Sequence, residues 1–156
     1  MSRVPSELLL YCRPGFERDL AEELVDKVAA AGWAGEAVQG VGGGFVRFCV
    51  ANGEPANGLH RALPLTTLVF ARQSLVALPP LALDREDRLS PITEQVVESG
   101  WSFESIWHET PDTNDGKALV GLAKALSRPL ESLLKKRGAL RRKAWGATAA
   151  PAVERR

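Results

Sequence analysis

Apolar residues in the first part of the chain follow two periods, one typical of a strand and one typical of a helix. Residues 8–11 form a short apolar run, and Pro14 and Gly15 then signal a turn. After the turn, apolar residues at helical spacing line one side of a helix; they are Leu20, Ala21, Leu24, Val28 and Ala31. Acidic residues occupy the other side, which should repel nucleic acid. The pattern predicts a strand, a turn and an amphipathic helix.

The following segments continue as strands and a short helix. Gly35–Gln39 and Phe45–Val50 have the pattern of two strands of a hairpin, separated by the glycine-rich residues 40–44. Residues 55–63 indicate a short helix, and the β-branched and aromatic residues 65–72 indicate a strand. The order β-α-β-β-α-β is that of a ferredoxin-like unit, with four antiparallel strands and two helices on one face. We place this unit at residues 1–73.

Residues 74–143 show a second pattern that mixes helix and strand. Ser90 resembles an N-cap, and Pro91 then stands at the first helical position. Residues 101–109 alternate between two sets of side chains and predict a strand. The sequence therefore predicts an α+β protein, in which a small second unit follows the ferredoxin-like one.

The last segments are expected to be helical and then irregular. Helices are predicted at residues 117–126, where Leu119 and Leu122 should be buried against the preceding strand, and at residues 129–137. Residues 144–156 consist mainly of small residues without periodicity. We expect them to form a disordered tail.

Composition is that of a folded protein from a reducing compartment. Hydrophobic residues make up 45% and charged residues 25% of the 156 residues, which suffices for one moderate core or two small ones. Cys12 and Cys49 lie far apart without further metal ligands nearby, so neither a zinc site nor a disulfide is expected. No apolar run approaches the ~20 residues of a membrane span, and the N-terminus does not resemble a signal peptide. We expect a cytoplasmic protein with two reduced thiols, no metal and no membrane contact.

Charge is unevenly distributed along the chain. Residues 1–127 hold 11 Lys and Arg against 17 Asp and Glu, whereas residues 128–156 hold 9 against 2. Six of these cations fall within nine positions that contain no acid, namely Lys135, Lys136, Arg137, Arg141, Arg142 and Lys143. Such a patch binds RNA by neutralising phosphates and releasing counterions, largely independently of base sequence. A solvated charged surface has the same composition, so both interpretations stay open.

Residues 112–117 form a polar loop in front of a predicted helix. In one interpretation its Asp and Asn side chains hydrogen-bond nearby backbone amides and cap that helix. In the other, Asn114 and Lys117 contact RNA phosphate and sugar. Lys117, Lys124 and Arg128 would then form one basic stripe on the side of the helix opposite its leucines.

No catalytic arrangement is recognisable in the sequence. His60 and His108 are the only histidines, and neither lies beside a Ser, a Cys or a pair of carboxylates. Glycine-rich residues 40–44 precede a strand, whereas a dinucleotide-binding loop precedes a helix. Arg13, in the first turn, is either an RNA contact or the ion-pair partner of Glu17. We therefore assign no catalytic, cofactor-binding or metal-binding residue.

Five short segments carry a family resemblance in the same order and at compatible spacing. They are LLYCRPGFERDLAEEL at residues 9–24, LVFARQ at 68–73, DRLSPI at 87–92, DTNDGKAL at 112–119 and RPLESLLKKRGAL at 128–140. Each alone is weakly specific. Together they resemble the N-terminal half of the bacterial large-subunit rRNA methyltransferase M family, over about residues 7–140.

The resemblance implies a THUMP-type RNA-binding region built together with a ferredoxin-like unit. The family uses S-adenosylmethionine to methylate a cytidine ribose 2′-OH in 23S rRNA. We find no strand–glycine-loop–helix segment for that cofactor and no Lys-Asp-Lys-Glu set, so we expect no methyltransferase domain in this chain. The preferred hypothesis is a non-catalytic RNA-binding module whose partner is 23S rRNA. The alternative is a small α+β enzyme or ligand-binding protein with a pocket between its two units.

Overall fold

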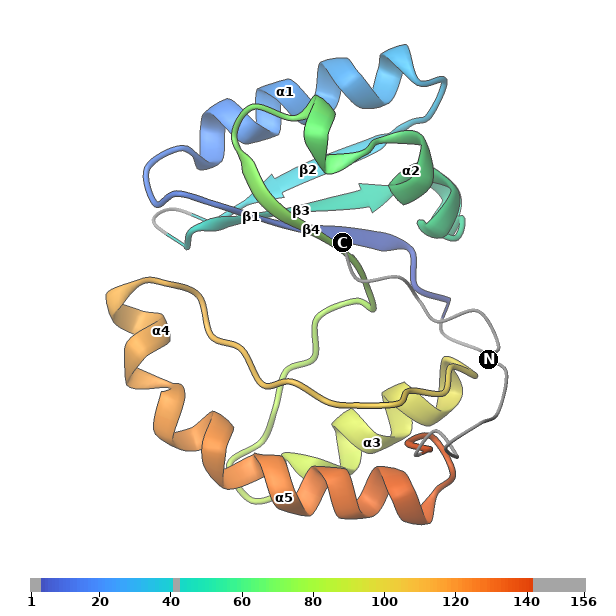
Figure 1. Ribbon diagram of the computed structural model, residues 1–156, viewed down its shortest axis with the longest axis vertical. Helices are drawn as coiled ribbons and strands as arrows, with labels where there is room; N and C mark the ends of the chain where they lie inside the picture. Colours follow the sequence, from blue (N-terminus) through green and yellow to red (C-terminus); the bar gives the residue numbers. More distant parts are fainter. Residues whose placement is uncertain (1–3, 41–42, 142–156) are drawn as a thin grey trace. The chain divides into compact units, whose positions relative to one another are not determined.

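The computed structural model describes residues 4–40 and 43–141 of the chain (Figure 1). These residues form two compact units: the sheet unit, Val4–Pro80 with Thr110–Leu119, and the helical unit, Leu81–Glu109 with residues 120–141. The regular elements in chain order are β1 (Glu7–Cys12), α1 (Glu17–Ala30), β2 (Gly35–Gln39), β3 (Phe45–Val50), α2 (Asn57–Ala62), β4 (Ala71–Ala77), α3 (Leu89–Glu98), α4 (Asn114–Ala118) and α5 (Val120–Lys136).

The sheet unit has the ferredoxin-like order of elements that the sequence predicts. Its four strands lie in the order β2-β3-β1-β4, and every neighbouring pair is antiparallel. In the central pair, Leu8 lies opposite Phe48 and Leu10 lies opposite Val46, so that all four side chains point to one face. These four side chains are fully buried. The α+β fold class is thereby confirmed.

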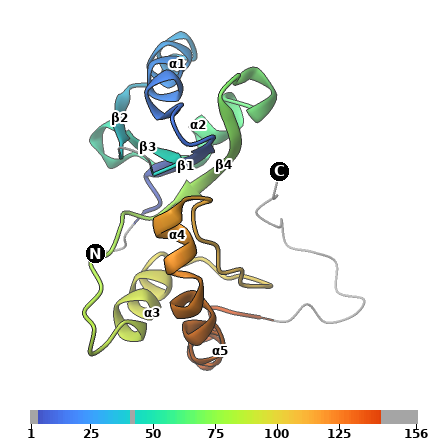
Figure 2. The same ribbon diagram turned by 90° about the vertical axis from the view of Figure 1, so that its left-hand side faces the viewer.

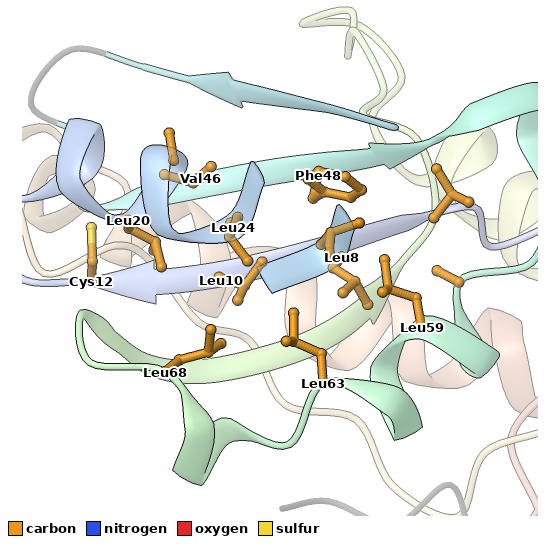
Figure 3. Close-up of a cluster of buried hydrophobic side chains, with 14 residues drawn as sticks. Leu8, Leu10, Cys12, Leu20, Leu24, Val46, Phe48, Leu59, Leu63 and Leu68 are labelled. Atoms are coloured by element: carbon orange, nitrogen blue, oxygen red, sulfur yellow. The ribbon is translucent and has the colours of Figure 1, made fainter. Parts of the chain in front are cut away.

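Helices α1 and α2 cover the apolar face of this sheet, and Figure 3 shows the side chains that meet there. The buried leucines from outside the strands are Leu20, Leu24, Leu59, Leu63 and Leu68. Those of α1 are four residues apart, as the helical period of the sequence predicts. Glu22 and Asp26 lie on the outer side of α1 and remain exposed.

The last strand of the sheet lies further along the chain than predicted. Leu65–Thr67 is a single 3₁₀ turn, because the Pro64 carbonyl accepts hydrogen bonds from both the N–H and the hydroxyl of the last residue of that turn, at 2.9 and 2.7 Å. The Glu23 carboxylate of α1 then accepts the N–H groups of Val69 and Phe70, at 2.6 and 3.1 Å. Strand β4 therefore starts later, and it runs through the unit boundary that the sequence analysis places after residue 73.

The helical unit is built mainly from α3 and α5, which pack side by side (Figure 2). Its buried residues are Leu130, Leu134, Ala139 and Leu140. The predicted strand at residues 101–109 is wrong, because only Phe103 forms a β-bridge, to Leu140. The N–H of Phe103 donates to the Ala139 carbonyl, and its carbonyl accepts the N–H of Arg141, both at 2.8 Å. An alternating pattern of side chains is therefore not sufficient for a strand, because a strand needs backbone hydrogen bonds along several residues and here only one residue has them.

Helix α5 continues through Pro129, where the sequence predicts a break between two helices. Proline leaves the carbonyl four residues earlier without its helical donor, but Ala125 is exposed and water can solvate that carbonyl. Leu130 and Leu134 define the buried side of this long helix. Leu119 and Leu122 are 49% and 36% exposed, so the prediction that they are buried is wrong.

Helix α3 begins one residue before the predicted N-cap. The N-cap is Arg88 rather than Ser90, and Oδ1 of the preceding Asp87 accepts the N–H of Ser90 at 3.0 Å. Among residues 4–40 and 43–141, no helix is both long and apolar enough to span a membrane. Arg142, Lys143 and the predicted tail at residues 144–156 lie outside the described residues.

Candidate nucleic-acid interface

The solvent side of α5 carries the cations that the sequence analysis singles out. Lys124 and Arg128 are one helical turn apart and both are exposed. Lys136, in the last turn, is also exposed. None of these three cations makes an ion pair with any residue in the described part of the chain. Their charges are therefore available to an anionic partner.

The other cations of this region already have protein partners. Lys135 pairs with Glu131 at 2.7 Å, and Arg137, the residue after α5, pairs with Glu94 of α3 at 2.5 Å. The Arg137 guanidinium lowers the pKa of the Glu94 carboxyl through its hydrogen bond and its charge. Arg141 donates its Nε–H to the Gly138 carbonyl at 3.1 Å, just past the helix end. Both ion pairs are exposed, and such pairs exchange readily for contacts with solvent or ligand.

A second cluster of candidate residues lies in the sheet unit, around Gly44. We call it the Gly44 junction: the Cys12–Gly15 turn, Gly44, and the Thr110–Leu119 segment. Gly44 has a left-handed φ of 68°, and its carbonyl accepts the N–H of Cys12 at 2.9 Å. A Cβ at Gly44 would lie 3.4 Å from Cγ2 of Thr113 and 3.6 Å from Cγ of Pro14. The junction therefore brings together segments that are about a hundred residues apart in sequence.

Thr113 shapes the part of the junction that carries Asn114 and Lys117. Its Oγ1 accepts the N–H of Gly116 at 3.0 Å and caps α4, so this loop does cap the helix, but through Thr113 and not through the Asp and Asn side chains that the sequence indicated. Gly116 is buried, and a Cβ there would overlap the Pro111 carbonyl. Asn114 and Lys117 remain exposed. Capping therefore leaves their side chains available for a ligand.

Arg13 is exposed and lies in the turn of the same junction. The structure does not support an ion pair with Glu17, one of the two alternatives for Arg13, because both oxygens of that carboxylate accept backbone N–H groups instead. Oε2 accepts the N–H of Gly15 and Oε1 accepts the N–H of Gly44, each at 2.9 Å. Sequence reasoning missed this role for Glu17, although an acid in the first turn of a helix is a recognisable signal.

The remaining chemical groups have structural roles. Both cysteines are free. Burial, with a smaller contribution from the Glu17 carboxylate, raises the pKa of the Cys12 thiol, and burial also raises that of Cys49. The ring of His60 contacts the Ser74 carbonyl through Nε2 at 3.2 Å. No cluster of potential metal ligands occurs among the described residues.

A hollow of about 550 Å³ lies between α1 and β2, within the sheet unit. Glu22, Asp26 and Glu36 contribute three carboxylates to its lining. Arg18 also lines it, and this cation is paired with Glu22 at 2.9 Å. An acidic surface of this kind repels RNA. Any RNA contact should therefore lie elsewhere on the sheet unit.

Comparison with known proteins shows to which protein family the sequence of this chain is related. Residues 5–75 match the family described as RlmM ferredoxin-like domain, and residues 87–151 match that described as Ribosomal RNA large subunit methyltransferase M, N-terminal. A protein named Ribosomal RNA large subunit methyltransferase M from Chromohalobacter salexigens is 66% identical over 147 residues. This chain belongs to the methyltransferase M family. It corresponds to the N-terminal region of that family.

More distant relatives share the same name and the same extent of similarity. The protein from Tolumonas auensis is 40% identical over 136 residues, and that from a Marinomonas species is 37% identical over 139 residues. The three alignments cover 94%, 86% and 89% of this chain but 41%, 37% and 39% of the respective relatives. The chain thus spans about two fifths of the length of these methyltransferase M relatives.

The two matched regions meet at the Gly44 junction. Gly44 and Arg13 lie in the region that matches the ferredoxin-like domain of methyltransferase M, whereas Asn114 and Lys117 lie in the region that matches its N-terminal family. Thr110–Leu119 nevertheless belongs to the sheet unit. A segment of the second family region is therefore built into the ferredoxin-like unit.

Lowering the pH should destabilise the sheet unit through Glu17. Burial raises the pKa of this carboxyl, but the N–H donors of Gly44, Glu17 itself and Gly15 outweigh burial and hold the pKa below its usual value of 4.5. A carboxyl whose pKa is lowered by folding stabilises the fold above its unfolded pKa, and this contribution disappears as pH falls through its folded pKa.

The free energy of unfolding should therefore fall from about pH 6 to about pH 3, and Glu17→Gln should reduce this dependence. Urea denaturation at several pH values measures both. The Cys12 thiol, whose pKa is raised, stays protonated throughout and does not contribute. An equal pH dependence in wild type and variant would show that other carboxyl groups cause the acid destabilisation.

Proposed function

We propose that this chain binds structured RNA and holds ribosomal RNA for methylation by the whole protein. The observation that carries this proposal is the set of three exposed cations on α5, Lys124, Arg128 and Lys136. No acid among the described residues pairs with them. Cations on a rigid helix neutralise phosphates and release counterions, which favours RNA of many sequences. The name of the relatives supports ribosomal RNA of the large subunit as the partner.

The finer proposal follows the family resemblance. The RNA is 23S rRNA, the methyl acceptor is a cytidine ribose 2′-OH, and the second family region is of the THUMP type, acting in the cytoplasm. S-adenosylmethionine would supply the methyl group in the whole protein. The described glycine-rich residues do not fit that cofactor, because their run connects β2 to β3 rather than a strand to a helix. We therefore assign to residues 4–141 a role in binding RNA and no chemical step.

Photochemical cross-linking tests which surface of the protein contacts RNA. A 23S rRNA fragment containing 4-thiouridine is irradiated with the protein, and the cross-linked peptides are identified by mass spectrometry. Peptides from α5 and from the Thr110–Leu119 segment should dominate, because these carry the available cations. A random hairpin of equal length is the control for specificity. Cross-links confined to the acidic side of α1, or none at all, would overturn the proposal.

A further inference from the structure

Glu17 is the first residue of α1 and is only 6% exposed, an unusual position for an acid that forms no ion pair within residues 4–40 and 43–141. Its two carboxylate oxygens each accept one backbone N–H at 2.9 Å, from Gly15 and from Gly44. A negative charge is favoured in the first turn of a helix. Burying a carboxylate nevertheless costs desolvation free energy. An uncharged N-cap residue such as Ser or Asn would stabilise the start of a helix without that cost.

The two hydrogen bonds of Glu17 fix backbone that does not belong to α1. Gly44 is held from both sides, since its N–H donates to Glu17 and its carbonyl accepts the N–H of Cys12. Pro14 and Thr113 both pack against the space where a Cβ of Gly44 would lie. The carboxylate therefore links the turn that contains Arg13 to Gly44, and Gly44 in turn borders the segment that contains Asn114 and Lys117.

We propose that Glu17 is a positioning residue, which holds Arg13, Asn114 and Lys117 as one surface that contacts the ribose–phosphate backbone of structured RNA. This inference rests on the proposed function and adds a site in the sheet unit to the cations of α5. Arg13 and Lys117 supply charge for phosphates, and the Asn114 amide can donate to or accept from a ribose hydroxyl. A duplex or stem is read through such backbone and 2′-OH contacts rather than through its bases.

The test is a double-mutant cycle on RNA binding. Wild type, E17Q, N114A/K117A and the combined E17Q/N114A/K117A protein are titrated against a fluorescent 23S rRNA fragment, and anisotropy gives each Kd. Gln keeps the size of the side chain, but its amide nitrogen cannot accept the second N–H. Thermal unfolding confirms that each protein is folded at the titration temperature. Exchange of the Gly44 amide proton, followed by NMR, reports whether the junction has loosened.

We expect E17Q to weaken binding by about 3- to 10-fold, with faster exchange at Gly44. If Glu17 acts through Asn114 and Lys117, adding E17Q to N114A/K117A should weaken binding little further. A purely structural role predicts two losses that multiply, and that result would overturn the inference. So would E17Q binding RNA as tightly as wild type. If wild type itself binds no RNA, the proposed function has failed, and the inference fails with it.

Discussion

Reversing three charges on α5, in the variant K124E/R128E/K136E, should weaken binding of structured RNA by about 10- to 100-fold at low salt. All three side chains are exposed and lack an acidic partner among the described residues. In the wild-type protein, each can therefore contact an RNA phosphate. The substitutions replace attraction by repulsion at every site. Because phosphates are common to all RNAs, the loss should be similar for an rRNA fragment and for a random hairpin. Fluorescence anisotropy with both RNAs measures it.

The matched control is K27E/R61E/R72E, which changes the net charge by the same amount on the sheet unit. These three cations are also exposed, and they lie on α1, on α2 and in β4. The control should lose much less affinity, because its effect is limited to the long-range field of the protein. Equal losses in the two variants would mean that net charge, rather than the surface of α5, governs binding.

Replacing Phe48 with alanine should lower the free energy of unfolding by about 3–5 kcal/mol, the usual cost of truncating a buried aromatic side chain. Phe48 lies in the central pair of strands and is 1% exposed. Its ring occupies space left by Gly35, where a Cβ would lie 2.5 Å from Cε1 of the ring. Truncation leaves a cavity that the surrounding structure fills only in part. Urea denaturation followed by circular dichroism measures the change.

Phe16→Ala is the matched control for this prediction. Phe16 is 40% exposed and stacks on Phe70 with 5.9 Å between ring centroids. Its truncation should cost only about 1 kcal/mol, because most of the lost contact is a surface stack. If Phe48→Ala is too unstable to purify, Phe48→Leu gives a smaller loss in the same direction. Similar denaturation midpoints for Phe48→Ala and Phe16→Ala would contradict the placement of the core.

The order of elements in the sheet unit could be predicted because local periods carry it. Alternation in β1 and β3 and the helical spacing of Leu20 and Leu24 each describe a buried face without reference to distant residues. The position of β4 could not be predicted in this way. It depends on the turn closed by Pro64 and on Glu23, a residue of α1 that lies more than 40 positions away.

The second unit was harder to predict because its sequence patterns do not determine which backbone segments pair. The alternation around Phe103 predicts a strand, but in the structure only Phe103 of that segment forms a β-bridge, to Leu140. Treating Pro129 as a helix break placed Leu119 and Leu122 on a buried side. Once α5 is continuous, its buried side is set by Leu130 and Leu134.

The candidate site was predicted in part. Helical spacing located Lys124 and Arg128, and the run of charges located Lys136. The sequence could not show that Arg137 is paired with Glu94, because that acid lies 43 positions earlier on another helix. Nor could it show that Glu17 binds Gly44 across 27 positions and joins Arg13 to the loop of Asn114. These links depend on tertiary structure.

The most direct test of RNA binding through α5 is a salt series of anisotropy titrations on wild type and K124E/R128E/K136E. Three or four neutralised phosphates, at ~0.7–0.9 per contact, predict a slope of log K against log salt of about −2 to −4 for wild type. The variant should have a clearly shallower slope over the same range, because it loses three phosphate contacts. A wild-type slope near zero, or equal slopes for the two proteins, would show that the cations of α5 do not bind RNA phosphates.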